Sequence, residues 1–119
     1  MIFHEDEKEQ FIRLYRYHKA HTDAHFLLEF GDGETYVASW ETAYETDNAT
    51  ELLIDVEDAR YDEFHQIAFR IITAPQCATR EYNGYITIDY RDFPSRVINV
   101  DMGEVVYPGT DEVHPRKPL

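Results

Sequence analysis

The first twenty residues repeat apolar side chains at the spacing of a helix. The apolar face carries Phe11, Ile12, Leu14, Tyr15 and His18, which recur every three or four residues. Carboxylates precede this stretch and basic side chains follow it, an order that the helix dipole favours. The pattern predicts a helix over residues 5–21.

After this helix the apolar positions alternate, which is typical of strands. The segments 25–30 (HFLLEF) and 36–44 are joined by Gly-Asp-Gly, which favours a tight turn between antiparallel strands. Tyr36, Trp40 and Tyr44 would share one face of the second strand. Such a stripe can form an aromatic binding platform, but more often it is the core of a sheet, and we interpret it as core.

Alternation continues through the rest of the chain. Further strands are predicted over 51–58, 61–72, 85–90, 96–100 and 102–108, the last of them a short edge strand. The first of these would place Leu52, Ile54 and Val56 on one face. Residues 61–72 also fit a helix face, but their Phe and Ile side chains favour a strand. Polar connections indicate a turn at 46–50, an exposed loop at 76–84 and a loose tail over 108–119.

Together these elements predict a mainly β fold with an N-terminal helix. We expect one domain over residues 1–119, with a small, strongly bent antiparallel sheet or an Sm/SH3-like barrel over about 24–107. The predicted core consists of Phe11, Leu14, Leu28, Trp40, Ile54, Phe69, Ile86 and Ile98.

The order of the elements resembles that of the small Sm-like (SH3-type) β-barrel family. The first Sm motif would be the strand 26–30, its glycine turn, the strand 36–44 and Asp47-Asn48; the closing element would be the strands 85–90 and 96–100. The resemblance implies a barrel and, as in RNA-binding members, a site for single-stranded RNA at Tyr36, Asp47 and Asn48. Ala38 stands where the family usually has glycine, and the Arg-Gly pair that helps those members clamp a base is absent.

Charge bears on this alternative, because 24 acidic residues face 11 basic ones, for a net charge of −13. Such a chain repels phosphates, so binding to nucleic acid or to an anionic membrane is disfavoured. Carboxylates concentrate between residues 41 and 63, where Arg60 is the single base. A surface that meets a basic protein partner would use Glu41, Glu45, Asp47, Glu51, Asp55, Glu57 and Asp58. The same acidity could instead keep the protein in solution or reflect adaptation to salt.

Other chemistry has little support in the sequence. His18, His21 and His25 are the best candidate metal ligands, but histidines also suit a helix end, and we expect no tight metal and no cofactor. The single cysteine, Cys77, excludes an internal disulfide, and no nucleophile motif or phosphate-binding loop is present. The opening residues show no secretory signal and no apolar stretch could span a bilayer, so a cytoplasmic protein is expected.

These observations favour a non-enzymatic interaction module that binds a basic protein. Two alternatives remain: a single-stranded RNA or oligonucleotide binder of Sm type, and a small metal protein or enzyme built on the three early histidines. Association into a homo-oligomer is compatible with each of them.

Overall fold

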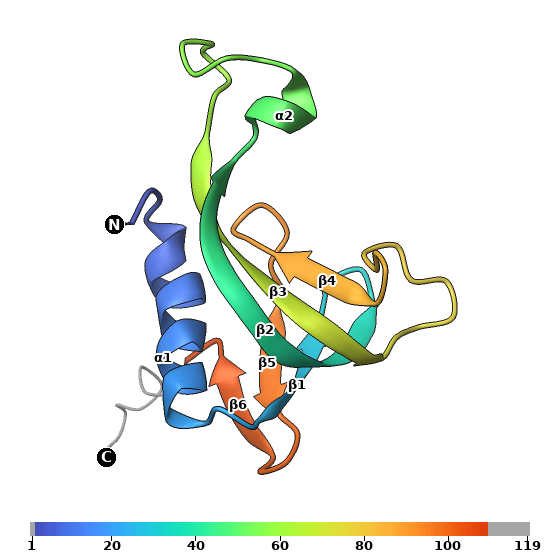
Figure 1. The fold of residues 1–119 in the computed structure, drawn as a ribbon. Helices are drawn as coiled ribbons and strands as arrows, with labels where there is room; N and C mark the ends of the chain where they lie inside the picture. Colours follow the sequence, from blue (N-terminus) through green and yellow to red (C-terminus); the bar gives the residue numbers. More distant parts are fainter. Residues whose placement is uncertain (1, 110–119) are drawn as a thin grey trace.

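The computed structural model describes residues 2–109, which form one bent antiparallel sheet and an N-terminal helix (Figure 1). The strand order is β4-β3-β2-β1-β5-β6. The strands are β1 (His25–Glu29), β2 (Thr35–Asp47), β3 (Glu63–Thr73), β4 (Tyr85–Ile88), β5 (Arg96–Asn99) and β6 (Glu104–Tyr107). The mainly β fold class and its strongly bent sheet are confirmed, and residues 63–72 of the ambiguous segment 61–72 belong to a strand.

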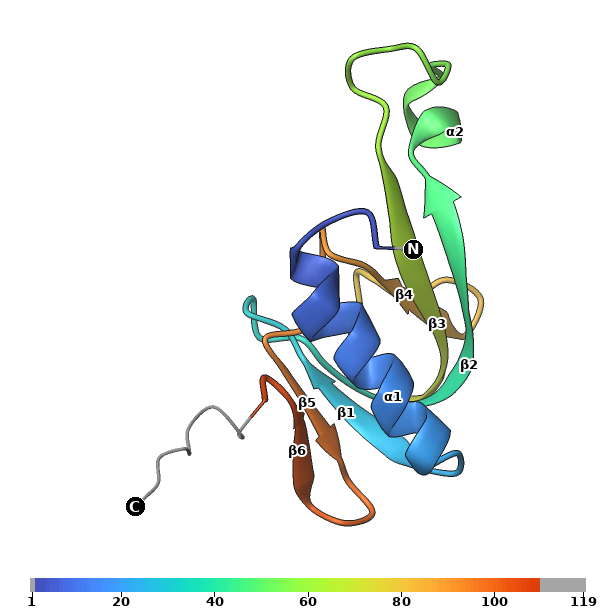
Figure 2. The ribbon, with the colours of Figure 1, turned by 90° about the vertical axis from the view of Figure 1, so that its left-hand side faces the viewer.

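The N-terminal helix has two parts, a π-helical turn η1 (Lys8–Ile12) and the α-helix α1 (Arg13–Ala20). It lies across the inner face of the sheet (Figure 2). Leu14 is its buried anchor, and Phe11 and Tyr17 pack at the margin of the core. The predicted helix is therefore confirmed, with a wider first turn than the sequence indicated.

The core follows from alternation along most of the strands; β3 is the exception, since consecutive residues of it are buried. Side chains that point inward are buried, whereas their neighbours in sequence stay partly or fully exposed. The fully buried apolar side chains are Leu14, Phe26, Leu28, Tyr36, Ala38, Phe64, Ile67, Phe69, Ile86, Ile88 and Val97. Four predicted core residues are among them, and Phe11 and Trp40 are partly buried against the core.

Two predicted core residues are not buried. Ile98 is half-buried because Val97 and Asn99 are the inward positions of β5. Ile54 is also half-buried, because the predicted strand over 51–58 does not form. That segment contains the short helix α2 (Ala49–Leu52) followed by a loop. The predicted turn at 46–50 is likewise replaced, since β2 continues to Asp47 and α2 follows directly.

A β-bulge changes the aromatic stripe that the sequence predicted on β2. Trp40 pairs with Phe69 and Thr42 with Ala68, so Glu41 is an extra residue on its strand. The alternation shifts by one, and Ala43 takes the next position against the core. Tyr44 consequently turns outward and is exposed, which corrects the prediction that it shares a face with Tyr36 and Trp40.

The sheet remains open, because β4 pairs only with β3 and β6 only with β5 within residues 2–109. The predicted edge position of residues 102–108 is confirmed. The predicted tail begins with Pro108 and Gly109, and residues 110–119 lie outside the described part of the chain.

Arg80 connects the 76–84 loop to the body of the sheet. Its guanidinium lies 2.7 Å from a carboxylate oxygen of Glu34, 2.8 Å from Asp92 and 3.1 Å from Asp32. It also lies 3.7 Å from the centre of the Phe30 ring. Such a planar cation can satisfy several carboxylates at once, so it ties three loops together.

Candidate interaction surface

The β2–β3 hairpin extends well beyond the strands on either side of it. β1 pairs with β2 only over residues 35–39, and β4 pairs with β3 only over residues 67–70. The remaining part, residues 42–66, forms an arm that projects from the sheet (Figure 1). We call residues 48–62, where the arm ends, the tip.

The seven carboxylates predicted to meet a partner divide between the arm's base and its tip. At the base, Glu41 forms an ion pair with Arg70 at 3.4 Å, and Glu45 lies 3.6 Å from the His65 imidazole. Asp47 accepts hydrogen bonds from the Ala49 backbone N–H and from the Tyr61 hydroxyl, which fix the turn that leads into α2. These three side chains are partly engaged within the fold.

The other four carboxylates belong to the tip. Glu51 lies 3.2 Å from Arg91, and Asp58 binds the Arg60 guanidinium at 3.0 Å. Asp55 accepts a hydrogen bond from the backbone N–H of Glu57, which is itself exposed. The tip is thus rich in negative charge, although Arg91 is bound to Glu51 and Arg60 to Asp58.

Apolar side chains are exposed among these carboxylates. Leu53 is 90% exposed, Val56 66% and Leu52 44%. A single exposed leucine needs no explanation, but three apolar side chains within five residues of a protruding tip form a patch. The sequence predicted Leu52 and Val56 on one face of a strand with Ile54, and it did not indicate an exposed patch that includes Leu53.

Leu53 also has an unfavourable backbone conformation. Its φ is 56° and ψ 48°, the left-handed region, and it ends α2 by donating its N–H to carbonyls of the preceding turn. Glycine or asparagine normally fills this position, because a side chain with a Cβ costs about 1–2 kcal/mol there. The tip therefore contains a solvent-exposed leucine in a strained backbone conformation.

Asn48 links the two ends of the tip by hydrogen bonds. Its amide nitrogen donates to the Arg60 carbonyl at 2.8 Å, and its amide oxygen accepts from the Asp62 backbone N–H at 2.9 Å. Tyr61 donates its hydroxyl to Asp47 at 3.0 Å. Partial burial and this hydrogen bond raise the pKa of Tyr61 to about 12. The tip is consequently a closed loop with a defined shape.

Glu7, just before η1, links the arm to the N-terminal helix by hydrogen bonds. The His65 imidazole Nδ1 lies 2.5 Å from the Glu7 carboxylate, and the His65 backbone N–H donates to the same group at 3.1 Å. Both side chains are buried. Phe11 stacks on the imidazole, with ring centres 4.5 Å apart. This buried pair orders the base of the arm.

A second set of contacts holds the start of β3. The Asp62 carboxylate lies 2.7 Å from the His4 imidazole and accepts a hydrogen bond from the Tyr90 hydroxyl. Burial and that hydrogen bond raise the pKa of Tyr90 to about 12. The Arg91 guanidinium covers the Phe64 ring at 3.9 Å. The arm is therefore positioned on two sides, and its tip is presented in one orientation.

The residues of the RNA alternative lie apart from any open platform. Tyr36 is fully buried and donates its hydroxyl to Glu34 at 2.8 Å. Asn48 is occupied by the tip backbone, as described above. In this structure neither side chain is accessible to a nucleotide base.

The three early histidines contact three different partners. His18 stacks on Trp40 with ring centres 4.3 Å apart, and burial lowers the pKa of His18. The His21 Nδ1 lies 3.1 Å from the Tyr17 carbonyl, and the His25 Nδ1 lies 3.1 Å from Asp101. Over residues 2–109, no group of three His, Cys, Asp or Glu side chains is arranged to hold a metal ion.

Sequence reasoning located the acidic segment but missed the apolar patch and the contacts that hold the arm. One signal was present: LLIDV is a short apolar run enclosed by carboxylates on both sides, which is unusual for a buried strand. The Glu7–His65 pair joins residues far apart in the chain, and no local sequence pattern predicts this contact.

None of the helices over residues 2–109 has the length and apolar character needed to cross a membrane. No protein-family model, curated protein or solved structure matches this chain.

Proposed function

We propose that this protein is a non-enzymatic interaction module whose arm tip binds a protein surface that is both basic and apolar. The observation that carries the proposal is Leu53, a leucine 90% exposed with φ of 56° at the end of a projecting arm. The left-handed backbone ends α2, but that role does not require a leucine, so the exposed apolar side chain itself brings no benefit for folding. Strain of this kind is found where a side chain must be presented to a partner.

Burial of the patch would supply the affinity. Fully burying a leucine or valine side chain contributes about 1.5–3 kcal/mol. Leu53 is 90% exposed and Val56 66% exposed before binding, so most of this free energy is available to the complex. The arm's contacts with Glu7 and Asp62 hold the tip in place beforehand, which lowers the entropy lost on association.

The carboxylates of the tip determine the sign of the partner. Asp55 and Glu57 are exposed beside the apolar patch. Negative charge around an apolar centre speeds the approach of a positive surface and penalises a negative one. Because exposed charges are screened over about 8 Å at physiological salt, binding should weaken as salt rises.

The test is a titration with a labelled amphipathic peptide of alternating leucine and lysine, followed by fluorescence anisotropy at low and physiological salt. Leu53→Asn and Val56→Ser should each weaken binding several-fold, because both remove contact area without changing charge. Met102→Ser is the matched control, since Met102 is 63% exposed and lies outside the arm. It should bind as the unaltered protein does.

The charge contribution is tested separately with Glu57→Gln and with Asp23→Asn, a control of equal charge change on an exposed residue outside the tip. Only Glu57→Gln should reduce the salt dependence appreciably. Equal losses in the tip and control variants would mean that the peptide responds to net charge alone, and the proposal would fail. Labelled oligo-U is the opposing probe: tight binding of oligo-U at low salt would restore the RNA alternative.

A further inference from the structure

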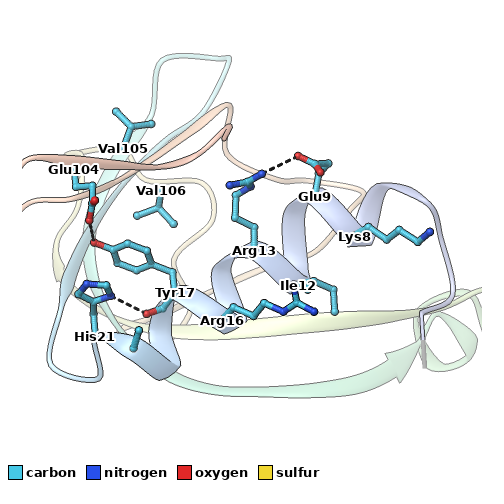
Figure 3. A pocket seen from close by; sticks show the side chains of 11 residues that line it. Lys8, Glu9, Ile12, Arg13, Arg16, Tyr17, His21, Glu104, Val105 and Val106 are labelled. Atoms are coloured by element: carbon cyan, nitrogen blue, oxygen red, sulfur yellow. Dashed lines mark hydrogen bonds and ion pairs between the residues drawn. The ribbon is translucent and has the colours of Figure 1, made fainter. Parts of the chain in front are cut away.

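A groove lies between the N-terminal helix and β6, on a different part of the molecule from the arm tip (Figure 3). Its cavity volume is about 530 Å³, within the range of pockets that hold a ligand of moderate size. Ile12, Val105 and Val106 supply its apolar lining. The groove can therefore accept one or two aliphatic side chains.

Basic side chains line the helical wall of this groove. Lys8, Arg13 and Arg16 all belong to it, although the whole chain has only 11 Lys and Arg residues against 24 carboxylates. Figure 3 shows these three side chains following one another along the helix. Arg13 and Arg16 are three residues apart, which places them on one side of α1, and Lys8 begins the π-helical turn before it.

The two carboxylates of the groove are both engaged. Glu9 accepts a hydrogen bond from Arg13 at 3.3 Å, and Glu104 accepts one from the Tyr17 hydroxyl at 2.6 Å. Lys8 forms an exposed ion pair with Glu5 at 3.4 Å, the kind that contributes little and exchanges easily. Arg16 is exposed, and within the described residues it has no carboxylate partner. Arg16 thus presents positive charge beside the apolar lining.

We infer that this groove receives the arm tip of a second copy of the chain. Leu53 and Val56 would enter against the apolar lining, and the neighbouring Glu57 would face Arg16. This inference rests on the proposed function and names its partner, because the groove has the two properties that the tip requires. The two surfaces are complementary in charge and in apolar character, and both belong to the same molecule.

The arrangement of the fold determines the type of assembly. The tip stands at the end of the arm, and the β6 wall of the groove lies toward the opposite end of the molecule (Figure 1). One copy therefore contributes its tip and its neighbour contributes its groove, a head-to-tail contact. The contact is small compared with a standard interface of about 1,600 Å², so weak, concentration-dependent association is expected.

Sedimentation equilibrium of the full chain over a wide concentration range tests this inference. The weight-average mass of the unaltered protein should rise with concentration at low salt and fall back toward the monomer at high salt. Arg16→Glu should abolish association, because an acidic groove repels an acidic tip. Glu57→Lys should do the same, because a cation at position 57 then faces Arg16.

Mixing these two variants is the decisive step. The Glu57→Lys tip matches the Arg16→Glu groove, and the unaltered tip and groove of the two chains also match. The mixture should therefore regain association that neither variant shows alone. Lys19→Glu is the matched control, because it makes the same change in charge on α1 outside the groove, and it should leave association unchanged.

A monomer at every concentration would overturn the inference, as would a mixture that stays monomeric. If the leucine–lysine peptide still bound the tip of that monomer, the proposed function would stand and only its partner would change. If Leu53→Asn left self-association intact, the groove would bind some other surface, and the inference would likewise be wrong.

Discussion

Replacing Leu53 with asparagine should make the protein more stable, which is unusual for the loss of a large apolar side chain. The left-handed conformation of Leu53, with φ of 56°, costs a residue with a Cβ about 1–2 kcal/mol. Asparagine tolerates this region better, because its short polar side chain bonds locally. Most of this strain should therefore disappear in Leu53→Asn.

Little is lost in exchange. Leu53 is 90% exposed, so only about a tenth of its burial free energy, a few tenths of a kcal/mol, contributes to folding. The expected net change is a gain of about 0.5–1 kcal/mol in the free energy of unfolding. For a chain of 119 residues this corresponds to a rise of about 2–6 °C in the melting temperature.

Urea unfolding followed by fluorescence measures this change, because Trp40 is the single tryptophan and packs at the core. Asn83 provides a matched reverse experiment: its φ is 54°, it is exposed, and Asn83→Leu should cost about what Leu53→Asn gains. If Leu53→Asn destabilised the protein while Asn83→Leu had no effect, the strain argument would be refuted. Leu53 would then be a packing residue.

Three further perturbations test the body of the fold. Phe69→Ala should lower the free energy of unfolding by about 3–5 kcal/mol in urea titrations, because this buried ring packs among other core aromatic rings; a loss below 1 kcal/mol would contradict the described core. Glu7→Ala should lower the free energy of unfolding by about 1–3 kcal/mol, because it leaves the buried His65 N–H groups without an acceptor. Glu7→Gln keeps a carbonyl oxygen as an acceptor and should lower it by less. Equal losses in the two variants would count against a stabilising role of these hydrogen bonds. Burial alone would raise the pKa of Glu34, but hydrogen bonds from Thr79, Tyr36 and Arg80 outweigh it and lower the pKa to about 2 from its ordinary 4.5. The stability that the Glu34 carboxylate contributes is therefore complete above pH 4.5 and is lost as the pH falls toward 2. Unfolding free energies measured from pH 5 to pH 2 should fall less steeply in Glu34→Gln than in the unaltered protein, and an unchanged slope would show that Glu34 is not responsible.

The sequence by itself determined the secondary structure wherever one face of an element is buried. The helical period before residue 21 and the alternation of β1, β4 and β5 produce the observed elements, because each pattern leaves one arrangement that removes the apolar side chains from water. The segment that forms β3 fitted both a strand and a helix face, and its Phe and Ile side chains favoured the strand. The acidic character of residues 41–63 was equally plain. Both properties are local, and the chain carries them in its order of residues.

The tertiary structure alone decided which apolar residues are buried where the pattern could be satisfied in two ways. Residues 52–56 alternate like a strand, but no neighbouring strand extends far enough to pair with them, so they form a helix and loop at the tip. The bulge at Glu41 is a similar case. One extra residue in β2 turns the Tyr44 side chain from the core face to the solvent face, and no sequence pattern predicts this bulge.

The candidate sites depend on contacts between distant parts of the chain. The tip is presented because Glu7 binds His65, and the groove exists because α1 lies beside β6. A sequence records which side chains are available for such contacts, but their distances follow from how the elements pack. For that reason the acid of the arm could be predicted, whereas the exposed Leu53 and the basic groove became visible only in the folded molecule.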